Sequence, residues 1–271
     1  LATPIADLSD SIEVGPGAAQ RCGESSLFMV LIQTEDVSGS DHSILRLIEG
    51  EDSELSWQVD LGETEKIKAA PVIVDMDEDG KPEILVAYDA GGSLNVDAWS
   101  PRLSCTVTGW SYSGHSEELL WSWNDESLMI SSDEGPYTSG ILGGHKPTTQ
   151  PLLADIDLDG DAELVIAAID EVSEDPVVLA LPLQVNGTPN SLWEVSLSKG
   201  SHPSDPAFAQ IDDDTGYVIL TTIEANNGGM WVWKIDSETG SSTWQGGLSL
   251  NNLDGDTNSP HIRLPGPIIA N

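Results

Sequence analysis

One pattern recurs along the chain and constrains its fold more than any other: a proline, a short apolar run, and an acidic or amide residue. Copies begin at five positions, and a tryptophan follows each of the first four within its unit. The copies are Pro4–Asp7, Pro71–Asp75, Pro151–Asp155, Pro206–Gln210 and Pro267–Asn271, and the tryptophans are Trp57, Trp121 with Trp123, Trp193 and Trp244. Fixed landmarks at irregular spacing indicate one supersecondary unit that is repeated with loops of variable length.

Inside a unit the apolar periodicity is that of strands. Short β-branched runs at 71–75 and 83–88 are followed by alternating apolar residues at 94, 96 and 98, and then by the tryptophan segment. Four strands per unit without a helical period predict an all-β chain, a β-propeller of four-stranded antiparallel blades. A β-solenoid would need shorter rungs, and two sandwiches would not repeat four times. The expected blades are 3–60, 70–123, 150–197 and 205–246, with the first strand of a further blade at 266–271.

Two units carry an acidic loop between their first and second strands. Carboxylates at alternate positions, followed by a glycine that permits a sharp turn, can wrap oxygen atoms around one hard cation. The residue after the glycine offers its carbonyl, and a glutamate two residues later closes the shell. The candidate ligands are Asp75, Asp77, Asp79, Lys81 and Glu83 in one loop, and Asp155, Asp157, Asp159, Asp161 and Glu163 in the other.

Calcium suits this donor set better than magnesium, which accepts fewer protein oxygens, or zinc, which prefers histidine and cysteine. The loops are not EF-hands, because position 12 holds Val86 or Ile166 within a predicted strand. The competing interpretation is a solvated acidic turn in an acidic protein. Because the full loop occurs twice at the same place in the repeat, we instead expect two Ca²⁺ sites.

The other units do not repeat the loop in full. The third copy contains Asp212 and Asp214 but lacks the first carboxylate and the closing glutamate, so we expect a weak or empty site there. The first unit has a longer, non-matching loop from Leu8 to Ser26. Alternating residues at 252–258 lie elsewhere in their unit and fit an Asx-rich turn better than a metal site.

The segment Pro71–Val86 resembles the FG-GAP or VCBS repeat, which forms the blades of integrin α-chain propellers and of many secreted microbial proteins. The segment Trp231–Trp244 is closer to the PQQ-like propeller repeat, in which a tryptophan docks between blades. The resemblance implies propeller blades, structural calcium and an extracellular binding role. It does not imply quinone binding, because no cofactor-site residues match. Such propellers usually have more than four blades, so we expect this chain to be part of a larger propeller.

The predicted blades place Cys22 and Cys105 in loops on one face of adjacent blades, which favours a disulfide over two unrelated thiols. The triplet Asn186-Gly-Thr188 is a glycosylation sequon. A disulfide, calcium loops and a sequon together indicate a location outside the cytosol.

Candidate contact residues lie in two long loops. Trp110 and Tyr112, in the insertion at 101–117, could stack on a sugar. The connection from Asn124 to Gln150 contains Tyr137 and His145, and by resemblance it lies on the face that binds partners. The alternative is that this connection only covers a blade junction.

The charge excludes several partners. The chain has 271 residues, with 46 Asp and Glu against 10 Lys and Arg, a formal net charge of −36. Nucleic acid and anionic lipid surfaces both require clustered basic residues. The longest apolar run, Leu27–Ile32, is far shorter than a membrane span. The charge fits a marine or halophilic microbe, or a calcium-loaded acidic exterior.

The sequence lacks the Gly-x-Ser-x-Gly and His-Glu-x-x-His motifs and a glycine-rich phosphate loop. We therefore expect a non-catalytic, extracellular, calcium-stabilised propeller scaffold. It would serve adhesion, ligand binding or surface assembly, with a protein, a glycan or other copies of the chain as partner. The alternative is a carbohydrate-binding or carbohydrate-cleaving propeller domain.

Overall fold

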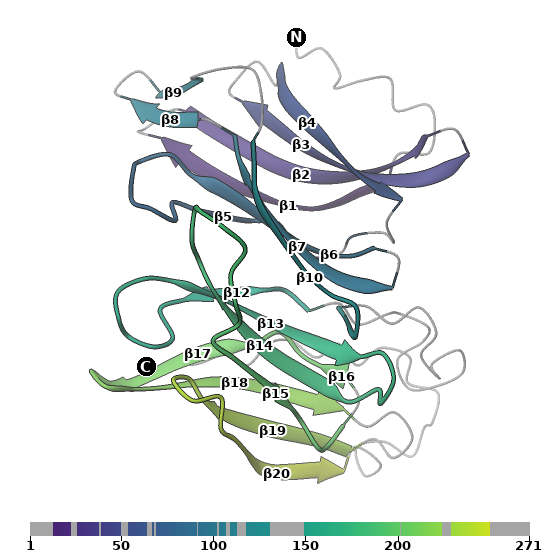
Figure 1. Cartoon of the computed structure of the whole chain (residues 1–271), viewed down its shortest axis with the longest axis vertical. Helices are drawn as coiled ribbons and strands as arrows, with labels where there is room; N and C mark the ends of the chain where they lie inside the picture. The colour runs from purple at the N-terminus through teal and green to yellow at the C-terminus, as the bar shows by residue number, and fades with distance from the viewer. Residues whose placement is uncertain are drawn as a thin grey trace. The chain divides into compact units, whose positions relative to one another are not determined.

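The computed structural model describes the chain as β-strands joined by turns (Figure 1). The described residues contain no helix, so none of them forms a helix that could cross a membrane. The prediction of an all-β chain with four-stranded antiparallel sheets is confirmed for this part of the chain. The described residues are 13–22, 26–37, 39–49, 54–63, 67, 69–90, 92–101, 103–106, 109–112, 118–130, 149–200, 202–223 and 229–249.

The chain divides into two compact units. Unit 1 comprises residues 1–125 together with 184–188, and unit 2 comprises 126–183 together with 189–271. Each unit contains two large antiparallel sheets, and these are numbered here from sheet 1 to sheet 4 along the chain.

Sheet 1 is a meander whose strands follow one another in sequence order. The loop expected from Leu8 to Ser26 is wrong for residues 13–22, which form a strand. A Cβ atom at Gly17 would lie 2.8 Å from the carbonyl oxygen of Val30, so glycine lets the two strands approach. A bulge adjoins Gly17 in the pairing. The strands are β1 (Glu13–Cys22), β2 (Ser26–Val37), β3 (Ser40–Glu49) and β4 (Glu54–Glu63).

Sheet 2 has the strand order β10-β7-β6-β5. All seven residues from Glu83 to Asp89 are buried, so the second strand is buried on both faces and does not alternate between buried and exposed side chains. The insertion between the third and fourth strands contains a two-stranded hairpin of its own. The strands are β5 (Val72–Val74), β6 (Glu83–Ala90), β7 (Ser93–Ser100) and β10 (Glu118–Asp125), and the hairpin is β8 (Leu103–Thr106) with β9 (Gly109–Tyr112).

Side chains from sheets 1 and 2 form the core of unit 1. The Tyr88 hydroxyl donates a 2.7 Å hydrogen bond to the carboxylate of Asp97, which keeps this polar pair satisfied within the buried face. The buried cluster consists of Phe28, Val30, Ile32, Leu45, Leu47, Trp57, Val59, Ile67, Ile84, Val86 and Tyr88.

Sheet 3 has an edge strand in two pieces, because β11 and β12 both pair with β13. The connection expected from Asn124 to Gln150 therefore contains a short strand at Leu128–Met129, and its residues 131–148 lie outside the described part. The strands are β11 (Leu128–Met129), β12 (Leu152–Ala154), β13 (Glu163–Asp170), β14 (Pro176–Pro182) and β15 (Trp193–Ser196).

Sheet 4 repeats this arrangement, since β16 and β17 both pair with β18. The backbone N–H of Gln150, just before β12, donates a 2.7 Å hydrogen bond to the Asp205 carboxylate, just before β17. The first strands of sheets 3 and 4 are thereby tied together. The strands are β16 (His202–Pro203), β17 (Ala207–Asp212), β18 (Thr215–Ile223), β19 (Gly229–Asp236) and β20 (Ser242–Ser249).

The core of unit 2 lies between sheets 3 and 4. Its buried cluster consists of Ile156, Val165, Ala167, Val178, Ala180, Trp193, Leu197, Val218, Leu220, Trp233 and Ile235.

A tryptophan on the last strand of sheet 3 anchors sheet 4. The Trp193 indole N–H donates a buried 2.7 Å hydrogen bond to the Ser237 carbonyl, in the turn between β19 and β20. Gly240 of the same turn packs against this indole, and a Cβ atom there would lie 3.0 Å from the Trp193 Cβ. The contact satisfies both a buried donor and a buried turn carbonyl.

Unit 1 contains a hydrogen bond of the same kind. The indole N–H of Trp121, on the last strand of sheet 2, donates to the carbonyl of Gln184. Gln184 follows β14, the third strand of the next sheet along the chain. In both cases a tryptophan of a last strand therefore bonds to the turn that follows a third strand.

Replacing Trp193 with Phe should lower the free energy of unfolding by about 1–3 kcal/mol, because the Ser237 carbonyl loses its donor while buried. The matched control is Trp57→Phe. Trp57 lies on the last strand of sheet 1, is 7% exposed against 8% for Trp193, and its indole N–H has no acceptor among the described residues. Urea unfolding measures the loss of unfolding free energy in each variant, and we expect the larger loss for Trp193→Phe. Equal losses would contradict a stabilising role for the hydrogen bond.

Candidate metal centre

Two acidic loops occupy the same position in sheets 2 and 3. Each connects the short first strand to the buried second strand, β5 to β6 and β12 to β13. Val74 pairs with Glu83 in the first ladder, and Ala154 pairs with Glu163 in the second. The ladder therefore brings the closing glutamate back beside the aspartate that follows the first strand.

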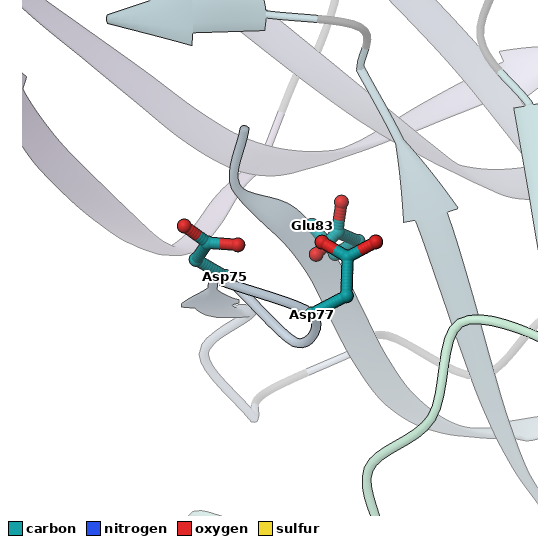
Figure 2. Close-up of side chains that lie close together, drawn as sticks. All are labelled: Asp75, Asp77 and Glu83. Carbon is teal, nitrogen blue, oxygen red and sulfur yellow. The ribbon is translucent and has the colours of Figure 1, made fainter. Parts of the chain in front are cut away.

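Three carboxylates converge in each loop. The groups are Asp75, Asp77 and Glu83, and Asp155, Asp157 and Glu163. Within each group, one carboxylate oxygen per residue lies within 4.8 Å of the others. Figure 2 shows the first group, with Asp77 beside Glu83 and Asp75 across the loop. Three oxygen donors at this spacing can hold a metal ion.

Backbone N–H groups orient the carboxylates of the first loop. Asp75 accepts hydrogen bonds from the N–H of Asp79 at 3.0 Å and of Gly80 at 2.8 Å. The turn that brings these N–H groups to Asp75 contains two residues with positive φ values, Glu78 at 56° and Gly80 at 82°. Glycine adopts the second of these conformations without steric cost, which explains its place in the motif.

The second loop has the same turn but fewer internal hydrogen bonds. The N–H of Gly160 donates to Asp155 at 3.2 Å, and the N–H of Asp159 donates to Asp157 at 3.3 Å. Leu158 and Gly160 have φ values of 62° and 103°, so the backbone path is repeated.

The closing glutamates are the buried members of the two groups. Glu83 and Glu163 are each 3% exposed. Glu83 accepts a 2.9 Å hydrogen bond from the N–H of Met76, and Glu163 accepts a 2.8 Å one from the N–H of Ile156. These N–H groups belong to the residue between the first two aspartates, a role that the sequence interpretation missed. In the sequence, this role is indicated only by the apolar residue that occupies the position in both loops, Met76 or Ile156.

The pKa of Glu83 and of Glu163 is raised to about 7, chiefly by burial and also by repulsion from the neighbouring aspartates, while the backbone hydrogen bond to each carboxylate opposes the shift. Burial also raises the pKa of Asp157. A bound cation stabilises the charged form of such a buried glutamate, because it compensates both the burial and the repulsion from the neighbouring aspartates.

An unsatisfied oxygen supports the same fit. Oδ1 of Asp155 is buried and has no hydrogen-bond partner among the described residues. A buried carboxylate oxygen without a partner is costly, and a metal ion is one of the partners that removes this cost. The donor set, all carboxylate oxygen, suits a hard divalent cation.

The remaining predicted ligands are not part of the converging groups. The Asp79 carboxylate is turned to the Lys81 ammonium and accepts the Lys81 N–H at 2.8 Å. Asp159 accepts the N–H of Asp161 at 2.9 Å, and the Asp161 side chain is exposed. Metal ligation by these four residues stays a prediction.

The third copy of the loop is a tight hairpin instead. Asp212 pairs with Thr215, so β17 and β18 continue through the region where the other sheets have an open loop. Tyr217 pairs with Ala209 and thus occupies the ladder position of the closing glutamate. The Lys234 ammonium lies 3.5 Å from the centre of the Tyr217 ring. Among the residues that the structure describes, only the two groups above are arranged to hold a metal.

Other predicted site residues are placed only in part. Trp110 and Tyr112 lie on β9, Cys105 on β8 and Cys22 at the end of β1. The side chains of Trp110, Tyr112 and Cys22 lie outside the described part, so the disulfide and the glycan contact stay predictions.

Tyr137 and His145 lie outside the described residues altogether. Asn186 of the sequon is exposed in a turn, and the hydroxyl of Thr188 donates to the Ser122 carbonyl at 3.2 Å.

Searches of family models, curated proteins and solved structures found no match to this chain.

In metal-free protein, Glu163→Gln should raise the free energy of unfolding at pH 8 and change it little at pH 4.5. In the native protein, the pKa of Glu163 is raised from 4.5 to about 7. Between pH 4.5 and pH 7 the folded protein therefore binds more protons than the unfolded chain. Stability from this residue therefore falls as pH rises through that window, by up to about 3 kcal/mol. Glutamine removes the charge and retains an oxygen for the Ile156 N–H.

The measurement is urea unfolding in chelator at both pH values. Glu194→Gln on β15, an exposed residue, is the matched control. A stabilisation by Glu163→Gln that is equal at the two pH values would contradict a raised pKa.

Proposed function

We propose that this chain is a calcium-stabilised β-propeller module that binds a partner outside the cell and catalyses no reaction. The observation that carries the proposal is the repeated group of converging carboxylates, each closed by a buried glutamate at the start of a second strand. Two independent sheets with the same arrangement favour a selected metal site over an incidental acidic turn.

Calcium is the proposed ion because of the donors. Carboxylate and carbonyl oxygens on a flexible loop suit its six to eight ligands, whereas magnesium prefers to keep several waters. Neither group contains the histidine or cysteine that zinc prefers. Asp75, Asp77 and Glu83 would hold one ion, and Asp155, Asp157 and Glu163 the other, with Asp79, Asp159, Asp161 and the Lys81 carbonyl as further ligands.

Bound calcium would supply positive charge between carboxylates that otherwise repel one another. The chain's own contribution is to fix those carboxylates. The backbone N–H groups of Met76 and Ile156 orient the glutamates, and the glycine turn brings the aspartates around. Each ion would thereby tie the first strand of its sheet to the second, which stabilises the sheet edge.

The propeller assignment is supported by repetition. The chain forms successive four-stranded antiparallel sheets, and tryptophans of two last strands bond to turns after third strands. The resemblance of Pro71–Val86 to the FG-GAP or VCBS repeat supports the same assignment. One propeller region over residues 1–271, continued by further blades, is part of this proposal.

An extracellular location accompanies the proposed ion, because extracellular calcium modules work at about 10⁻⁴–10⁻³ M calcium. A net charge of −36 suits a hydrated surface in a saline environment, such as that of a marine or halophilic microbe. The proposed role is adhesion, ligand binding or surface assembly, with a protein or glycan as partner.

Calcium should raise the unfolding free energy of the metal-free protein, by about 2.7 kcal/mol for a site at a calcium concentration 100 times its Kd. Isothermal titration calorimetry should give two bound ions. Asp77→Ala and Asp157→Ala should each reduce that number to one, because each removes a converging carboxylate.

Asp212→Ala is the matched control, because Asp212 lies in the hairpin of the third copy. It should leave two ions bound. If the melting temperature at low salt is the same in calcium and in chelator, the proposed calcium sites are wrong.

A further inference from the structure

We propose that the two calcium sites are unequal: the loop at 155–163 binds calcium first, and Lys81 acts as a tethered competitor that weakens the loop at 75–83. This inference rests on the proposed function, since it assumes that both loops bind calcium.

The Asp79 carboxylate of the first loop is already paired. The Lys81 ammonium contacts Oδ2 of this carboxylate, and the Lys81 backbone N–H donates to Oδ1 at 2.8 Å. Both oxygens of the third aspartate are therefore engaged within the loop. An incoming cation has to displace the ammonium to use Oδ2, and it approaches a site that already carries a positive charge.

The second loop has no such competitor. Asp161 stands at the position of Lys81, and the Asp159 carboxylate accepts the Asp161 N–H at 2.9 Å without contacting any cationic side chain of the described residues. The side chains of the first loop sum to −4, because Asp75, Asp77, Glu78, Asp79 and Glu83 are opposed by Lys81. Those of the second loop sum to −5, from Asp155, Asp157, Asp159, Asp161 and Glu163. Coulomb attraction for a divalent cation is therefore stronger in the second loop.

The first aspartates differ as well. Oδ1 of Asp75 accepts the Asp79 N–H at 3.0 Å, so it is satisfied without a metal. Oδ1 of Asp155 is buried and has no partner among the described residues. A cation thus removes an unsatisfied acceptor in the second loop, whereas in the first it competes with an existing hydrogen bond.

The consequence is a graded response to calcium. The first loop lies in unit 1 and the second in unit 2. At intermediate calcium concentrations unit 2 is loaded while unit 1 remains metal-free. Unit 1 is therefore the part of the chain whose stability reports calcium in the higher range.

Single-site variants of the full chain test the order. Asp157→Asn leaves only the first loop, and Asp77→Asn leaves only the second. Their calcium Kd values are measured by competition with a chromophoric chelator, and circular dichroism checks that each variant keeps its strands. We expect the second loop to bind about tenfold more tightly, the effect of roughly 1.4 kcal/mol.

Exchanging the two distinguishing residues tests the cause. Lys81→Asp added to Asp157→Asn should tighten the first loop about tenfold, and Asp161→Lys added to Asp77→Asn should weaken the second by a similar factor. Asp213→Lys added to Asp77→Asn is the control, since it makes the same charge change in the exposed turn before β18. It should alter the Kd far less than Asp161→Lys does.

The outcomes separate the two proposals. Equal Kd values or a tighter first loop would overturn the inequality, and a Kd unaffected by Lys81→Asp would overturn the role of Lys81 as competitor; either result leaves calcium binding intact. An equal effect of Asp161→Lys and Asp213→Lys would overturn local competition by a lysine at this loop position, because general charge would then be the cause. Absence of calcium binding by the unmodified chain would overturn the proposed function itself.

Discussion

A glutamate that is almost fully buried begins the second strand of sheets 2 and 3, and both acidic loops are organised around it. The strand ladder fixes its position opposite the last residue of the first strand, and a backbone N–H fixes one of its oxygens. Burial then opposes its ionisation, and the aspartates around it add repulsion. A bound cation compensates both the burial of this carboxylate and its repulsion by the neighbouring aspartates. The proposed calcium sites follow from this constraint.

The surrounding sheets provide the rigid frame on which such a loop depends. The second strands β6 and β13 are buried on both faces, so the glutamates start from segments that cannot shift easily. In unit 2, the Trp193 indole and the Asp205 carboxylate hold successive sheets together at two places. Sheet 4 has no glutamate at this ladder position. Tyr217 takes its ladder position, and the loop contracts to a hairpin.

Much of the fold could be predicted from the sequence, because strand periodicity and turn residues are local signals. The repeated strands, the acidic loops and the absence of helix in the described part follow from them. The strand at residues 13–22 could not be predicted, since it depends on the close approach of Gly17 to β2. The split edge strand at Leu128–Met129 depends on pairing with β13, forty residues away in sequence.

The candidate site, like the fold, could be predicted from the sequence only in part. The alternating aspartates identify the loops, but only the folded ladder shows which carboxylates converge. It separates Asp77, which lies in the converging group, from Asp79, which is turned to Lys81. It also shows that Met76 and Ile156 matter through their backbone N–H groups, which no side-chain motif records.

Calcium binding at the two groups of carboxylates is the property on which the proposed function depends. A crystal structure grown in calcium, with anomalous diffraction data to identify the ions, tests it most directly. We predict one calcium peak in each loop, with Glu83 and Glu163 among the ligands. Well-ordered loops without an anomalous peak, or calcium bound only elsewhere on the chain, would contradict it.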